Sequence, residues 1–366
     1  SSLTANCKSY IDAMRAQING KEDYKARTLG NDSVKIESYL DTKGAVRVDK
    51  TDRSRGVNVT FSVDSGFEAK NYKIQYSTDS SFTTYLECDA NPSGTPIKNL
   101  YSNTTYYWKV IGSNGVISDN NGTFTTGDYT RWIDAYELYN VRDVGGYMTS
   151  SGKRVKQGLI YRGGEITDAE WGSDHAKTVS ENSKRIFRDV MGIKCEVDFR
   201  MDSQIGDSLK NTHKCHFAEN GDIEYKQIYL ESFSNTVNRY TSQIKQVFET
   251  FANADTAPVY FHCHGGADRT GTIGMLLLGL LGVSYTDVVI DYELTSYSSI
   301  KGGDCLRRHY QSGTYNDWPG LMNTLEGMSC WNKSNSLSSN VESFLKTKCS
   351  VSSTTIDKIR DIMIEK

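Results

Sequence analysis

The segment from His262 to Gly271 holds the residue types in this sequence that are best suited to chemistry. It reads His-Cys-His-Gly-Gly-Ala-Asp-Arg-Thr-Gly and lies between an apolar run and an apolar helical pattern. A strand, a glycine-containing loop and a helix in this order let the backbone N–H groups of the loop converge on one anion. The sequence therefore predicts an anion site whose binding residues are His264, Gly265, Gly266, Ala267 and Gly271.

Cys263 and Arg269 are the candidates for the nucleophile and the phosphate ligand. The converging N–H dipoles and the guanidinium group both favour the thiolate form of the cysteine. Five residues separate the two, so they can surround a tetrahedral anion while the planar guanidinium binds two of its oxygens. Phosphoryl transfer needs mainly positioning and charge stabilisation. We therefore predict hydrolysis of a phosphomonoester through a phosphocysteine intermediate.

Other side chains in and near the loop are candidates for supporting roles. Asp268 is the nearest group that could protonate the leaving oxygen, although a loop aspartate can equally cap the helix or anchor Arg269. Glu231 is a second candidate acid, with a solvated loop carboxylate as the alternative. We expect the hydroxyl of Thr270 to stabilise the departing thiolate and His262 to hold the loop from behind.

The composition indicates a globular chain without an extended surface for binding polyanions. Its 366 residues suffice for two domains, and the net charge of −3 is spread along the chain without a long run of one sign. We therefore expect no nucleic-acid partner and no polybasic membrane anchor. The longest apolar stretch, Ile273 to Val283, is too short for a transmembrane segment.

The cysteines and the start of the chain bear on redox state and location. None of the eight cysteines forms a C-x-x-C pair, which argues against a zinc ribbon. Most are expected to be buried, while Cys330 and Cys349 flank a Ser/Asn-rich stretch and could form a disulfide. The chain starts at Ser1 without an initiator methionine, as a trimmed exported protein would. This favours a secreted or cell-envelope location over the cytoplasm, whereas a catalytic thiol favours the reverse.

The hydrophobic pattern divides the chain into three segments. Residues 1–34 form a polar lead-in, with a short helix predicted where Ile11, Met14 and Ile18 recur. Residues 35–128 predict an antiparallel β-sandwich and residues 129–366 an α/β domain. The expected strands are Val57–Val63, Tyr72–Tyr76, Thr105–Val110, Val190–Phe199, Ile223–Leu230 and Ala257–His262, and the expected helices are Thr270–Leu281, Thr286–Ser296 and Thr354–Glu365.

The predicted sandwich resembles a fibronectin type III module. The run from Leu100 to Val110 is similar to the Leu-then-Thr-Tyr-Tyr-Trp-x-Val strand of that family, and Phe124 to Gly127 is similar to its usual exit. The resemblance implies a spacer or docking module that carries no catalytic residues. A protein or glycan partner for its exposed aromatic side chains is the alternative.

The α/β segment resembles the cysteine-dependent tyrosine phosphatase superfamily, and within it the atypical bacterial tyrosine/lipid phosphatase family. Residues 140–147 match its N-x-R-D-x-G-G-Y motif, residues 161–164 resemble Y-R-S-G, and residues 197–200 resemble D-L-R. The stretch from Asp291 to Leu294 and the last helix also fit. The resemblance therefore covers residues 129–366.

This resemblance implies a central, mainly parallel sheet flanked by helices, with no metal and no other cofactor. It implies hydrolysis of phosphotyrosine, with phosphoserine, phosphothreonine or phosphoinositides as further substrates, so the partner is a phosphorylated protein or a small phosphomonoester. The family often reads Gly-Lys-Asp-Arg where this chain has Ala267, and losing that cation argues against highly charged inositol head groups. The residues expected to form scaffold ion pairs or to support the site are Arg142, Asp143, Asp198, Arg200 and Arg162.

Other interpretations stay open at this point. The chain could be an inositol or phosphoinositide phosphatase, a phosphate-binding module without turnover, or an adhesion protein whose sandwich supplies the main function. The stretch from Thr295 to Asn340, rich in Tyr, Trp, Gly and Ser, could form a lid or one wall of the pocket. An irregular surface insertion is the alternative for that stretch.

Overall fold

The computed structural model describes residues 56–63, 71–112, 117–128, 130–166, 179–205, 214–298 and 317–366. The contacts divide the described chain into two compact units, with a boundary between Asp134 and Ala135. The short helix predicted around Ile11, Met14 and Ile18 lies outside the described residues.

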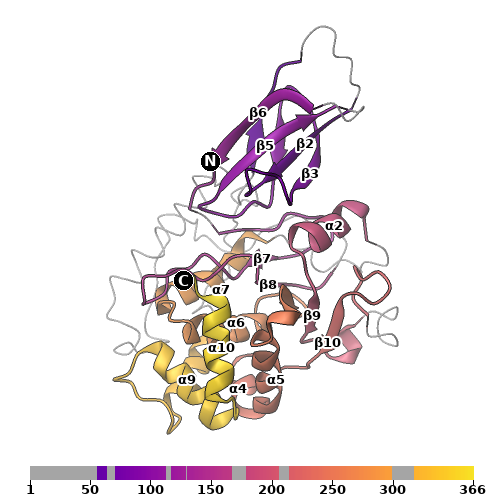
Figure 1. Cartoon of the computed structure of the whole chain (residues 1–366). Helices are drawn as coiled ribbons and strands as arrows, with labels where there is room; N and C mark the ends of the chain where they lie inside the picture. Colours follow the sequence, from indigo (N-terminus) through magenta and orange to yellow (C-terminus); the bar gives the residue numbers. More distant parts are fainter. Residues whose placement is uncertain are drawn as a thin grey trace, which may run out of the picture. The chain divides into compact units, whose positions relative to one another are not determined.

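The first unit consists of short antiparallel strands (Figure 1). One pair joins β1 (Val57–Val59) to β4 (Thr95–Ile97). A second sheet has the order β3-β2-β5-β6, and the bounds of its strands in that order are Leu86–Ala90, Tyr72–Ser77, Thr105–Ile111 and Ile117–Thr125. The three strands predicted for this region are therefore confirmed, although the first ends four residues earlier than expected.

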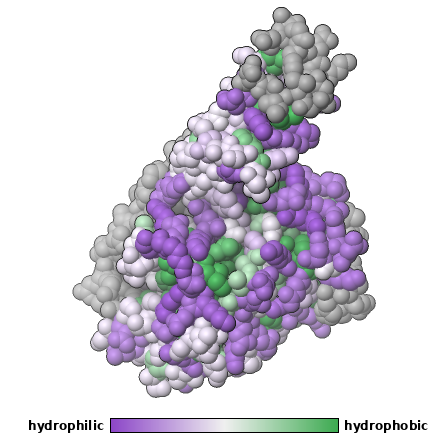
Figure 2. All heavy atoms as spheres, viewed as in Figure 1, coloured by the Kyte–Doolittle hydropathy of each residue, from purple (hydrophilic) through white to green (hydrophobic). Residues whose placement is uncertain are grey.

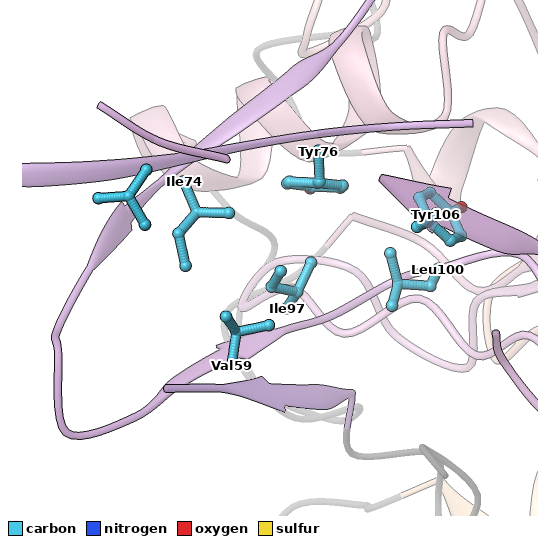
Figure 3. Close-up of a cluster of buried hydrophobic side chains, with 7 residues drawn as sticks. Val59, Ile74, Tyr76, Ile97, Leu100 and Tyr106 are labelled. Atoms are coloured by element: carbon cyan, nitrogen blue, oxygen red, sulfur yellow. The ribbon is translucent and has the colours of Figure 1, made fainter. Parts of the chain in front are cut away.

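The core of the first unit takes side chains from both sheets (Figure 3). Successive side chains of a strand point to opposite faces, so Ile74 and Tyr76 of β2 share the buried face. The buried cluster consists of Val59, Ile74, Tyr76, Ile97, Leu100, Tyr106 and Val110. The apolar residues that alternate in the sequence of β2 are thus the residues that are buried in the structure. The fibronectin type III assignment stays a prediction.

A five-stranded sheet forms the centre of the second unit, in the order β10-β9-β11-β8-β7 (Figure 1). In that order the strands are Glu224–Gln227, Cys195–Asp198, Val259–His262, Ile160–Gly163 and Arg142–Asp143. All neighbours are parallel except β7, which is antiparallel to β8. The carboxyl ends of β8, β9 and β11 therefore meet at one edge, where open α/β sheets bind their ligands.

Helices follow most of these strands. The helices confirmed from the sequence are α6 (Arg269–Leu280), α7 (Tyr285–Glu293) and α10 (Ser353–Met363). The remaining helices and helical turns are α2 (Glu181–Arg185), the π-helix η2 (Ile186–Val190), η3 (Asp202–Gln204), α4 (Phe233–Arg239), α5 (Thr241–Phe251), η4 (Ala254–Thr256), η5 (Leu294–Tyr297), α8 (Asp317–Glu326) and α9 (Leu337–Lys348).

The strand predicted over Val190–Phe199 is wrong in its first half. The π-helix η2 ends at Val190, and a non-regular turn leads into β9, which spans only Cys195–Asp198. Val190, Met191 and Ile193 are buried there like residues of a strand, so a short buried apolar run does not distinguish a strand from a turn.

The alternation of β11 sends its side chains to both faces of the sheet, and helical segments cover each face. On one face, Tyr260 contacts Phe187 of η2 edge-on, with ring centroids 5.6 Å apart. On the other, Phe261 contacts Phe251 of α5 at 5.5 Å. The residues of α6 from Thr270 to Leu280 are all buried, so this helix is enclosed rather than amphipathic.

Helix α8, which belongs to the stretch expected to be either a lid or a surface insertion, packs into the second unit. Trp318 of α8 is 1% exposed, and its ring lies 4.8 Å from that of Tyr292. Its indole N–H donates to the hydroxyl of Tyr285 at 3.1 Å. The interpretation as an irregular surface insertion is therefore wrong for α8, which contributes to the core.

The exposed surface carries no extended apolar face on the side that Figure 2 shows, where hydrophilic residues predominate and hydrophobic ones gather in small patches. Within the described ranges, no helix combines the length and the apolar character that crossing a membrane requires.

Phe187 offers a direct test of this packing. It is 0% exposed and stacks on Phe217 with centroids 4.4 Å apart. We expect Phe187→Ala to lower the free energy of unfolding by about 3–5 kcal/mol, because it leaves a cavity beneath the sheet. Urea denaturation measures the change. Tyr136→Ala, at a residue 62% exposed, is the control and should change stability by less than about 0.5 kcal/mol.

Candidate active site

The predicted reactive loop lies between β11 and α6, at the carboxyl end of the central strand. Cys263 directly follows the strand and is 2% exposed. The loop turns through Gly266, whose φ of +73° lies in the left-handed region that favours glycine. Asp268 is the N-cap residue of α6, and Arg269 is the first residue of the helix. The loop therefore ends at a helix N-terminus, as the sequence predicts.

Four successive carbonyl groups of this loop each accept a hydrogen bond from the surrounding structure. The acceptor and donor pairs are Cys263 O and His262 Nδ1 (3.0 Å), His264 O and Glu165 N (3.0 Å), Gly265 O and Asn140 Nδ2 (3.2 Å), and Gly266 O and Arg162 NH2 (2.9 Å). In a trans peptide the C=O and the following N–H point in opposite directions. Holding the carbonyls from outside therefore turns the N–H groups of residues 264–267 toward the inside of the loop.

Arg162, one of these donors, is held by a buried ion pair. Its NH1 lies 2.5 Å from Asp291 Oδ2, and neither side chain is more than 2% exposed. The hydroxyl of Tyr147 donates to the other carboxylate oxygen at 2.9 Å, and Arg142 donates to the carbonyl of Asp291 at 2.6 Å. Burial and the positive charge of Arg162 lower the pKa of Arg142 to about 9. The loop contact thus depends on a cluster of buried charges.

Asn140, another donor, connects the loop to the same cluster. Its Oδ1 accepts from Arg142 NH1 at 2.5 Å and from Ser298 Oγ at 2.9 Å, while its Nδ2 binds the loop carbonyl of Gly265. An amide group can donate and accept at once. This dual capacity explains why an asparagine stands at the start of the motif over residues 140–147.

The residues expected to form scaffold ion pairs are all buried. Arg142 Nε lies 3.7 Å from Asp291 Oδ1, and Arg200 NH2 lies 2.8 Å from Asp198 Oδ2. Asp143 contributes differently, because its two carboxylate oxygens accept backbone N–H groups on either side of a turn, each at 2.8 Å.

His264 is tied to the scaffold through a buried carboxylate. Its Nδ1 lies 2.8 Å from Glu165 Oε2, and the side chain of Glu165 is 1% exposed. The same oxygen accepts from Arg200 NH1 at 3.2 Å, and Arg200 also donates to Asp198 through Nε and NH2. Burial raises the pKa of Asp198, but the charges of His262 and Arg200 outweigh it and hold that pKa at about 2.

His262 lies buried behind the loop, with an acceptor next to each ring nitrogen. Nδ1 faces the Cys263 carbonyl, and Nε2 lies 2.7 Å from Glu196 Oε1. The parallel register places Glu196 beside Tyr260 and Asp198 beside His262, so these side chains share one face of the sheet. Burial alone lowers the pKa of His262, but the charge of Asp198 and the hydrogen bond to Glu196 outweigh it, so the pKa is raised.

Glu196, Asp198 and His262 are also residue types that bind metals, and their ligand atoms lie within 4.8 Å of one another. Asp198, however, already accepts from Arg200 and from the hydroxyl of Tyr225 at 2.5 Å. A cation placed among them would face the guanidinium of Arg200. The cluster therefore fits an ion-pair and proton network better than a metal centre.

Arg269 is held by the segment that follows β9. Its NH1 donates to Gln204 Oε1 at 2.8 Å and to the carbonyl of Phe199 at 3.3 Å. A guanidinium has five N–H donors in a rigid fork. Two contacts through one nitrogen fix its plane and leave the other nitrogens for two oxygens of a phosphate group.

The two candidate acids lie in different surroundings. The side chain of Asp268 makes no capping bond to α6, and its Oδ1 lies 3.5 Å from the hydroxyl of Tyr292, so the helix-capping alternative is wrong. Glu231 lies beside Tyr240, whose pKa is raised by burial and then by the charge of Glu231. Thr270 is buried, with Oγ1 3.5 Å from a backbone carbonyl of β8.

The described cysteines outside the loop are free thiols, and the suggested bridge between Cys330 and Cys349 is not formed. Burial, followed by the proximity of Cys330, raises the pKa of Cys349 to about 12. Burial likewise raises the pKa of Cys195 to about 12. Such thiols are inert at neutral pH, so neither is a candidate nucleophile.

The sequence profile of the tyrosine phosphatase family matches residues 133–365. The chain belongs to this family. The match includes the loop, the donors that hold its carbonyls and the helix that follows it.

Two relatives are similar to parts of this chain. A tyrosine-protein phosphatase of Nostoc commune is 37% identical over 123 residues, which cover 30% of this chain and 42% of that protein. A protein of Cupriavidus necator named as a tyrosine-protein phosphatase is 25% identical over 175 residues, 42% of this chain and 59% of that protein. The chain thus spans about half the length of these relatives.

One solved structure in the comparison is the core catalytic domain of the PP-IP phosphatase SIW14 from S. cerevisiae in complex with citrate. It shares 16% identity, with a TM-score of 0.28, over 38% of this chain and 74% of that one. Because the TM-score is this low, the likeness carries no argument about this member of the family.

Three residues that position the site in this family member were not predicted from the sequence, namely Glu165, Glu196 and Gln204. Glu196 stands two positions before Asp198 in a strand, so the period of two could have placed both on one face. Glu165 directly follows residues 161–164, but nothing local indicates its contact with His264. Gln204 reaches Arg269 from the three-residue 3₁₀ helix η3, which is too short for a periodic pattern to predict.

Gly266 tests whether the shape of the loop matters. A Cβ added at this position would lie 2.5 Å from the carbonyl carbon of Gly163, and the residue would have to keep a φ of +73°. We expect Gly266→Ala to lower kcat/KM by about 100-fold or more by displacing the loop. Gly152→Ala is the matched control, because Gly152 has a φ of +78° but nothing within 4 Å of an added Cβ. Equal losses in the two variants, measured with an aryl phosphate, would contradict this role for the loop.

Proposed function

We propose that this chain is a protein tyrosine phosphatase that acts through a phosphocysteine intermediate on Cys263. The observation that carries the proposal is the set of four loop carbonyls held from outside, which directs the N–H groups into the loop beside the thiol. Membership of the tyrosine phosphatase family supports the same class of reaction.

In the first step the thiolate of Cys263 attacks phosphorus. The S–P bond forms while the P–O bond to the tyrosine oxygen breaks. The loop N–H groups and the fork of Arg269 bind the three remaining oxygens, where the charge lies in the transition state. Asp268 gives its proton to the leaving oxygen, so the product departs as a neutral phenol.

In the second step water attacks the phosphorus of the phosphocysteine. The carboxylate of Asp268 takes a proton from this water as the new P–O bond forms. The S–P bond breaks, inorganic phosphate leaves, and Cys263 returns to its thiolate form. The hydroxyl of Thr270 stabilises the departing sulfur.

The composition of the loop favours phosphotyrosine over substrates with several phosphate groups. Ala267 is 3% exposed and apolar at the position where the resembling family often has lysine. A phosphate monoester on an aryl ring is bound by the N–H groups and Arg269 alone. For an inositol ring with further phosphates, the loop lacks the lysine cation that would bind those phosphates.

A substrate panel on the whole chain tests this function. We expect the highest kcat/KM for phosphotyrosine peptides, compared with phosphoserine peptides and inositol phosphates. Cys263→Ser should lower kcat by at least about a thousandfold, because an alcohol lacks the thiolate's nucleophilicity. Wild-type turnover in that variant would rule out the mechanism. Tight phosphate binding without product would instead indicate a binding module.

The role of Asp268 is tested by the leaving group. We expect Asp268→Asn to lower kcat for an alkyl phosphate by about 100-fold or more, because a poor leaving group needs a proton. For p-nitrophenyl phosphate the loss should be much smaller, since its leaving group is already stable as an anion. Glu231→Gln, at the other candidate acid, should leave both rates nearly unchanged. Equal losses for both substrates in Asp268→Asn would indicate damage to the loop.

A further inference from the structure

The hydrogen-bond partners of His262 indicate how many protons it shares with Glu196. Each of its two ring nitrogens faces a group that accepts a hydrogen bond. The carbonyl of Cys263 can only accept, so Nδ1 of His262 donates to it at 3.0 Å. An ionised carboxylate also only accepts, so Nε2 must donate to Glu196 at 2.7 Å. Both nitrogens donate only in the imidazolium form, unless the second proton sits on Glu196. In either case the pair carries one proton more than a neutral imidazole beside a carboxylate.

The groups around the pair decide which partner holds that proton. The titratable and charged groups that face it are Glu196 and Asp198 of β9, Arg200 after it, Tyr225 of β10, Tyr260 of β11, Cys215, Glu165 through Arg200, and Cys263 itself. Two carboxylates lie within 3.9 Å of the ring of His262. The positive charge of Arg200 is already shared between Asp198 and Glu165. A neutral ring would leave these buried carboxylates undercompensated, so the charges favour imidazolium.

We propose that Glu196 is a positioning residue that keeps His262 as a buried imidazolium behind Cys263 and thereby stabilises the thiolate. This rests on the proposed function in one respect, namely that the thiolate is the nucleophile. Nε2 of His262 binds Glu196 and Nδ1 binds the backbone carbonyl of Cys263, so the charged ring lies directly against the residue that carries the thiol. The raised pKa of His262 agrees with this assignment. In a buried site such a charge acts more strongly than in water.

Glu196→Gln provides the test, because it keeps the shape of the side chain and removes its charge. The readout is the rate at which iodoacetamide alkylates Cys263 over a range of pH, followed by mass spectrometry of the peptide that contains it. We expect the midpoint of this profile to rise by about one pH unit, which makes alkylation below the wild-type midpoint about tenfold slower. The acidic limb of kcat/KM should move in the same direction, while KM at alkaline pH changes little.

Glu224→Gln is the matched control. Glu224 lies on β10 of the same sheet, and its side chain is 53% exposed. The variant removes the same charge from the surface and should leave the alkylation profile unchanged. If Glu196→Gln leaves the midpoint in place, or slows the reaction equally at every pH, Glu196 has only a structural role and the proposal is overturned.

The ¹⁵N chemical shifts of His262 in the wild-type protein decide the position of the proton without any variant. Two pyrrole-like ring nitrogens at neutral pH would support imidazolium, and a pyridine-like nitrogen would overturn it. This measurement also decides the matter if Glu196→Gln does not fold. Neither alkylation nor the ¹⁵N spectrum needs a substrate, so failure of the proposed phosphatase activity is seen separately, as an absence of turnover in the wild-type chain.

Discussion

The hydrogen bonds that hold the four loop carbonyls from outside are the constraint on which the site depends. A peptide group is rigid, so fixing a carbonyl also fixes the direction of the next N–H. The donors come from three separate parts of the chain, around residues 140, 162–165 and 262. The sheet must therefore be assembled before the loop can take its shape. An anion cradle of this kind is a property of the tertiary fold and not of the loop sequence alone.

Burying a charged donor costs desolvation free energy, and the attraction of neighbouring opposite charges offsets that cost. Arg162 can bind the Gly266 carbonyl while buried because Asp291 lies against it. The enclosed helix α6 makes room for this pair at Gly274, where an added Cβ would lie 3.0 Å from Arg162 NH1. Buried ion pairs contribute little net stability. Their contribution here is to position a donor with a fixed direction.

The sequence predicts what is local in this molecule and misses what is distant along the chain. Cys263 and Arg269 lie at the two ends of one loop between a strand and a helix, as their spacing and flanking patterns predict, while their catalytic roles stay predictions. Glu165 and Gln204 contact that loop across 99 and 65 residues, and neither stands in a motif that indicates such a contact. The apolar residues at the end of η2 and in the non-regular turn before β9 predict a strand although none of them lies in one, because they are as buried as strand residues. Periodicity predicts which face is buried, whereas the register between strands decides which buried side chains meet.

That register also links both neighbours of Cys263 to one guanidinium, through two carboxylates. Arg200 binds Glu165, which holds His264, and it binds Asp198, which faces His262. Burial lowers the pKa of Arg200, but the charge of Asp198 outweighs it, so the group stays charged. A lysine could not make these directed contacts to two carboxylates with the same geometry. The orientation of the loop on either side of the thiol is therefore set as a unit, through one planar side chain at the end of β9.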